Sequence, residues 1–173
     1  MYLRNIISIF FILIFLLSCS KKPLEKSTIK ETNLELQMIE AYEEGLKELN
    51  RGDALFAAKK FNEAEILYPQ SEIAPQAALM AAYSYYSQNY YGDAEAELER
   101  FFKVYSNHKD ISYAKYLLAL CYYEQIVDEK KDLESIESSK RIFINIIEEY
   151  PNTDFAIDSE FKLDLINDIL AAK

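Results

Sequence analysis

The sequence predicts an all-α protein in which helix hairpins repeat along the chain. Two observations lead to this fold class. The 173 residues include only 3 Gly and 4 Pro, so few positions interrupt regular helices. Small and aromatic residues also recur with a period of 37, as at Gly45, Ala82 and Ala119. A period of this length is typical of stacked helical repeats, each of which buries its apolar face against its neighbours.

The first 18 residues predict a secretory signal peptide. Arg4 precedes an apolar run, Ile6 to Leu17, which is too short to span a bilayer. The alternative of a true membrane span is less favoured because Lys21 and Lys22 follow the run closely.

The end of this signal, Leu16-Leu17-Ser18-Cys19, resembles a bacterial lipobox. The resemblance implies cleavage after residue 18, acylation of Cys19 and a lipidated tether over residues 19–27. Ser20 stands where an aspartate often retains lipoproteins at the inner membrane, so we expect an outer-membrane location on the periplasmic side. The alternative is a signal that ends near a cysteine by chance.

Residues 28–173 predict the helical domain. We expect seven helices, near 28–50, 54–67, 74–88, 91–105, 110–126, 134–149 and 154–172. They group into repeat units at about 38–74, 75–111 and 112–153, with a partial unit at 154–173.

Residue types at fixed repeat positions identify the kind of hairpin. Small residues stand at positions 8 and 20, large residues at positions 11 and 24, and a Pro follows at position 32, as at Pro69 and Pro151. This is the pattern of a tetratricopeptide repeat (TPR), in which small residues let two helices approach closely. The prediction is therefore a TPR-type α-solenoid of about three and a half repeats, preceded by a lipoprotein signal peptide.

The turns between paired helices agree with this pattern. Position 15 ends the first helix and is expected in the left-handed region, where Gly52 and Asn89 are well tolerated. Eight additional residues fall within 126–138 and predict a charged, solvated loop. The last helix has a broad apolar face, so it either caps the array or continues into a longer solenoid; we favour a chain truncated at its C-terminus.

The first helix of each hairpin lines the concave face of a TPR array through positions 2, 5, 9 and 12. These positions fall on one side of a helix. Six tyrosines share them, and a peptide-binding groove is predicted from the following residues: Tyr42, Leu46, Leu79, Tyr83, Tyr86, Tyr113, Tyr116 and Tyr123. Tyrosine offers a rigid ring and a hydroxyl for peptide recognition. The alternative is ordinary packing between adjacent hairpins.

Composition excludes several other functions. The net charge of −10 argues against a nucleic-acid partner. The single histidine, His108, and the solvated spacing of the carboxylates support neither a metal site nor a catalytic group, so we expect no cofactor and no enzymatic activity. Cys121 lies in an apolar helical run and is expected to be a buried small hydrophobe.

The combination resembles the BamD family of outer-membrane protein assembly lipoproteins. The resemblance rests on the lipobox, on Tyr68-Pro69-Gln70-Ser71 followed by Ala74-Pro75-Gln76-Ala77, and on Lys162-Leu163-Asp164-Leu165-Ile166. It implies a periplasmic scaffold anchored in the outer membrane by lipid. The implied partners are the barrel-forming assembly subunit, the other lipoproteins of the complex and segments of unfolded outer-membrane proteins.

Three departures from the family pattern qualify this resemblance. Ser106 replaces the second Pro, the third unit carries the acidic insertion, and the chain ends within the fourth repeat. The half that docks on the central subunit is therefore expected to be mostly missing. The alternative function is another periplasmic TPR lipoprotein, an adaptor for cell-division or peptidoglycan enzymes.

Overall fold

The computed structural model describes residues 28–126 and 133–171, and these residues form helices joined by short turns. The helices are α2 (Thr28–Arg51), α3 (Ala54–Leu67), α4 (Ala74–Ser87), α5 (Tyr91–Val104), α6 (Ile111–Glu124), α7 (Leu133–Glu149) and α8 (Asp154–Ala171). Every predicted helix is confirmed. The predicted signal peptide, the tether with Cys19 and part of the insertion lie outside the described residues. The helix predicted near 134–149 is α7, which begins at Leu133.

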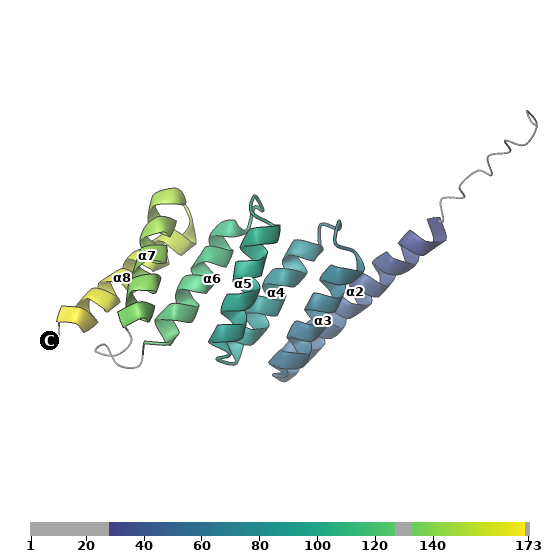
Figure 1. Cartoon of the computed structure of the whole chain (residues 1–173), viewed down its shortest axis with the longest axis horizontal. Helices are drawn as coiled ribbons and strands as arrows, with labels where there is room; N and C mark the ends of the chain where they lie inside the picture. The colour runs from purple at the N-terminus through teal and green to yellow at the C-terminus, as the bar shows by residue number, and fades with distance from the viewer. Residues whose placement is uncertain (1–27, 127–132, 172–173) are drawn as a thin grey trace, which may run out of the picture. The chain divides into compact units, whose positions relative to one another are not determined.

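From α3 to α8, consecutive helices pack against each other in a row, and Tyr42 of α2 packs on Phe61 of α3. The helices α3, α5 and α7 lie toward the viewer in Figure 1. The first helices of the hairpins, α4, α6 and α8, also contact one another in sequence. We call the side of the row that carries α2, α4, α6 and α8 the groove face. Among the helices within residues 28–126 and 133–171, none has the length and apolar character needed to cross a membrane.

Small residues allow the two helices of each hairpin to approach closely. Ala57, Ala94 and Ser139, at position 20 of the three units, are completely buried. Gly45 shows how tight the contact is, because a Cβ atom added there would lie 2.9 Å from the ring of Phe61. The large residues at position 24, Phe61, Leu98 and Phe143, fill the space beside these contacts.

The helix ends follow from local chemistry. Gly52 has φ 84° and Asn89 has φ 63°, which confirms the left-handed conformation predicted for position 15. The Asp53 carboxylate accepts a hydrogen bond of 3.0 Å from the Phe56 N–H and so caps α3. Pro75 stands at the start of α4, where its missing N–H costs no helical hydrogen bond.

The turns between hairpins are alike although Ser106 replaces a proline in one of them. In each turn a tyrosine carbonyl accepts a hydrogen bond from the N–H three residues later, as from His108 to Tyr105 at 3.0 Å. The same bond joins Ser71 to Tyr68 and Thr153 to Tyr150. Since this bond uses only the main chain, the turn does not depend on the proline.

Candidate functional site

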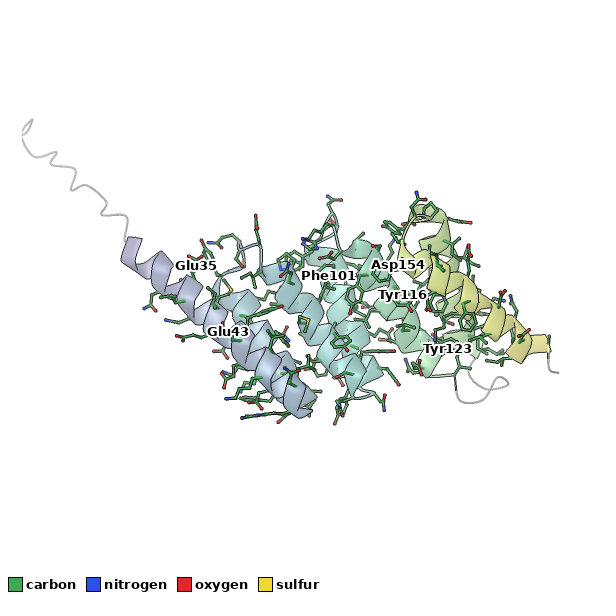
Figure 2. All side chains as sticks on the ribbon, turned by 180° about the vertical axis from the view of Figure 1, so that it is seen from behind. Glu35, Glu43, Phe101, Tyr116, Tyr123 and Asp154 are labelled. Atoms are coloured by element: carbon green, nitrogen blue, oxygen red, sulfur yellow. The ribbon has the colours of Figure 1, made fainter. Side chains whose placement is uncertain are left out.

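The predicted groove residues lie along the first helices of successive hairpins. Tyr42 and Leu46 are on α2; Leu79, Tyr83 and Tyr86 are on α4; Tyr113, Tyr116 and Tyr123 are on α6. Figure 2 labels Tyr116 and Tyr123 along α6 and Glu43 on α2. Cys19, the predicted lipidation site, lies outside the described residues.

These residues differ in how far they reach solvent. Leu46 and Tyr83 are each 37% exposed, whereas Leu79 is only 5% exposed and belongs to the hydrophobic core. The remaining tyrosines are half-buried, with part of each ring packed on core residues. The rings therefore fill space between hairpins and also present an edge to solvent. Packing between hairpins and peptide binding, the two alternatives for these tyrosines, are thus physically compatible.

Aromatic contacts hold the groove rings in place. Tyr83 and Tyr86 lie with ring centroids 6.5 Å apart. Tyr42 packs edge-on against Phe61 at 5.2 Å, and Tyr116 lies 6.3 Å from Phe143. Such pairs contribute roughly 0.5–1.5 kcal/mol each beyond simple burial. The rings are consequently fixed before any ligand arrives.

A cavity of about 350 Å³ opens on the groove face where four helical elements meet. Aromatic and apolar side chains from α2, α4, α6 and α8 form most of its wall, and three polar side chains complete it. The lining residues are Tyr42, Gln76, Leu79, Met80, Asp110, Ser112, Tyr113 and Phe155. Three of the predicted groove residues thus share one cavity.

Phe155 of α8 is the main groove residue that the sequence analysis missed. Its ring lies 5.3 Å from Tyr116 and 5.7 Å from Tyr113, centroid to centroid. Continuing the repeat into the partial fourth unit places Phe155 at position 2, so the periodicity contained the signal. Lys162 stands at position 9 of the same unit, and its amine lies 4.5 Å from the centroid of the Tyr123 ring.

The groove phenols are kept neutral. Burial raises the pKa of Tyr86 to about 12, with a smaller contribution from the Glu124 carboxylate. Burial likewise raises the pKa of Tyr113 to about 12. Burial also raises the pKa of Tyr116, whose hydroxyl donates to the Asp158 carboxylate. At neutral pH each hydroxyl therefore carries its proton and can donate or accept a hydrogen bond.

Potential metal ligands are dispersed over the part of the chain that the structure describes. Within residues 28–126 and 133–171, no three histidine, cysteine or carboxylate side chains are grouped so as to hold a metal ion. Cys121 is completely buried, as predicted, and burial raises the pKa of its thiol to about 12. A thiol in that state is a poor nucleophile.

The solved structure of the first TPR of Spaghetti (RPAP3) bound to the HSP90 peptide SRMEEVD has a similar fold. Its TM-score is 0.58 at 16% sequence identity, and the match covers 79% of this chain and 95% of that one. This likeness confirms the TPR-like fold class predicted from the residue positions.

Sequence comparisons identify the family. Outer membrane protein assembly factor BamD of Rickettsia prowazekii is 40% identical over 132 residues, covering 76% of this chain and 53% of the relative. The protein of the same name from Caulobacter vibrioides is 37% identical over 132 residues, covering 76% and 43%. The chain thus spans about half the length of these curated relatives. The family model YfiO, described as outer membrane lipoprotein, matches residues 34–173. The chain therefore belongs to the YfiO family of outer membrane lipoproteins, in which the relatives above are named as assembly factors and not as enzymes.

Proposed function

We propose that this chain is a non-catalytic scaffold in the assembly of outer-membrane β-barrel proteins, and that its groove face binds an extended segment of a client polypeptide. Lipid on Cys19 anchors the chain to the outer membrane from the periplasmic side. The barrel-forming assembly subunit and the other lipoproteins of the complex are its partners. The names of the relatives support the role in assembly.

The row of half-buried aromatic rings on the groove face is the main observation that supports the proposal of client binding. A segment of β-structure presents side chains on one side at every second residue, about 7 Å apart. The groove rings are spaced comparably, at 5.3 Å for Tyr116 and Phe155 and 6.5 Å for Tyr83 and Tyr86. Aromatic side chains of an extended client can therefore pack onto the exposed edges of successive rings. The similar TPR structure is bound to the HSP90 peptide SRMEEVD, and this supports a peptide as the class of ligand.

Removing groove rings tests the proposal directly. We expect Tyr83→Ala and Tyr116→Ala each to weaken binding of a peptide from the C-terminus of a porin by about tenfold or more, as for buried aromatic anchors. Fluorescence anisotropy with a labelled peptide measures the affinity, and circular dichroism reports whether the helices remain intact.

Tyr90→Ala is the matched control for this experiment. Tyr90 is 43% exposed and lies in the turn before α5, apart from the predicted groove set. The control variant is expected to bind like the unmodified chain. Unchanged affinity in both groove variants, with helical spectra preserved, would rule out this surface as the client site.

Partner capture tests the role in the assembly complex. We expect the full chain, purified from membranes in mild detergent, to bring down the barrel-forming assembly subunit, identified by mass spectrometry. Cys19→Ala removes the acylated thiol and is expected to move the chain out of the membrane fraction. Recovery of cell-division or peptidoglycan enzymes in place of the barrel subunit would favour the adaptor function.

A further inference from the structure

The cavity on the groove face is large enough for an aromatic side chain. A cavity of about 150 Å³ accommodates a benzene ring in other proteins, and this one measures about 350 Å³. Tyr113 and Phe155 form one wall, with their ring centroids 5.7 Å apart. Leu79, 5% exposed, belongs to the apolar lining. A ring that enters would therefore meet both aromatic and aliphatic surface.

The edge of this cavity is negatively charged. Of the eight described residues that line it, Asp110 alone carries a charged side chain. Asp110 stands at the N-cap of α6, but its carboxylate makes no capping hydrogen bond to that helix. Its Oδ2 atom lies 3.6 Å from Nδ1 of His108. Because Asp110 lines the cavity and its carboxylate does not cap α6, we take this carboxylate as the partner for a cationic group that enters the cavity.

Further carboxylates adjoin the groove tyrosines. Asp158 accepts the hydroxyl hydrogen bond of Tyr116. Burial raises the pKa of both Tyr86 and Tyr123, with a smaller contribution from the Glu124 carboxylate at the C-terminal end of α6. A positive charge lies at the end of α6 that is opposite Asp110, where the Lys162 amine is positioned over the Tyr123 ring. At that far end the charges of Glu124 and Lys162 are of opposite sign, whereas Asp110 is the one charged residue among the described residues that line the cavity, so the cavity favours a cation over an anion.

The following inference rests on the proposed function, because it specifies which client segments the groove accepts. We propose that the groove selects an extended segment in which a Lys or Arg stands two residues from an aromatic residue. The aromatic ring enters the cavity beside Tyr113 and Phe155, and the cation pairs with Asp110. A separation of two residues puts both side chains on the same side of an extended chain.

Three peptides that differ at one residue test this selection. Each is acetylated and amidated and carries the same aromatic residues, with Lys, Gln or Glu two positions from the central ring. At low ionic strength we expect the Lys peptide to bind the full chain in detergent about threefold more tightly than the Gln peptide, and the Glu peptide about threefold more weakly. One partly exposed ion pair has this size of effect.

The variant Asp110→Asn tests whether the preference for the Lys peptide depends on the carboxylate in the cavity. This variant is expected to bind the three peptides with nearly equal affinity. Glu99→Gln removes the same charge from an exposed position on α5 and is expected to keep the order Lys, Gln, Glu.

The outcomes separate this inference from the proposed function. Equal binding of the three peptides to the unmodified chain, or an unchanged order in Asp110→Asn, overturns the charge selection and leaves client binding intact. If none of the peptides binds, the proposed client site fails, and the selection fails with it.

Discussion

Replacing Phe143 with alanine is expected to lower the free energy of unfolding by about 3–5 kcal/mol, as in other large-to-small substitutions in protein cores. Phe143 is completely buried in the cluster formed by α6, α7 and α8. Deleting its ring removes apolar contact and leaves a void that close-packed neighbours fill only in part. Thermal denaturation followed by circular dichroism measures the loss.

The same substitution is expected to weaken peptide binding, although Phe143 is completely buried and does not line the cavity. The rings of Tyr116 and Tyr123 lie 6.3 and 6.4 Å from the Phe143 ring and lose this support. Phe161→Ala is the matched control because Phe161 is 59% exposed on α8. The control is expected to change stability by less than about 0.5 kcal/mol. A stability loss as small in Phe143→Ala as in the control would contradict the packing described here.

Arg100→Met is expected to lower the free energy of unfolding by about 2–3 kcal/mol. This value is reduced from the usual cost of breaking a buried ion pair because the Arg100 side chain is 38% exposed. The Arg100 guanidinium of α5 donates two hydrogen bonds, of 2.8 and 2.7 Å, to the Glu65 carboxylate of α3. The Glu65 side chain is only 8% exposed, so losing Arg100 leaves a carboxylate in a site that is poor in water.

A second substitution separates the ion pair from general damage to the helices. The double variant Arg100→Met with Glu65→Leu is expected to recover most of the lost stability, because the uncompensated charge is gone. Lys103→Met on the same helix is the control, since Lys103 and Glu99 form an exposed pair at 3.8 Å that contributes little. Urea denaturation of the four proteins completes the comparison. A double variant no more stable than Arg100→Met would argue against this account of the cluster.

The sequence predicted the helices and most of their ends because the signals for these features are local. Gly52, Asn89 and Pro75 act on the dihedral angles of their own turns, so no knowledge of tertiary structure is needed to place them. The expected effect of Ser106 was harder to judge. The turn is held by a main-chain hydrogen bond that any residue can make, so the missing proline leaves it unchanged.

The sequence predicted which residues share the groove face, but not how exposed each of them is. A period of 37 places side chains on a common face, yet it does not say how far neighbouring hairpins cover each one. Leu79 is buried and Tyr83 is partly exposed because of what packs beside them in space. Asp110 was missed as a groove residue for a related reason. It lies in a turn, where the helical period carries no information, and only the assembled hairpins bring it to the edge of the cavity.

The ion pair between Glu65 and Arg100 joins the second helices of two successive hairpins, whereas the groove tyrosines lie on the first helices. The Tyr105 hydroxyl and the Asn62 amide extend this junction with further hydrogen bonds. We expect this junction, which fixes the spacing of α3 and α5, to influence the spacing of the first helices on the groove face as well. Substitutions in this junction are therefore expected to change the affinity of the groove for a peptide. They would do so without altering any residue of the groove face.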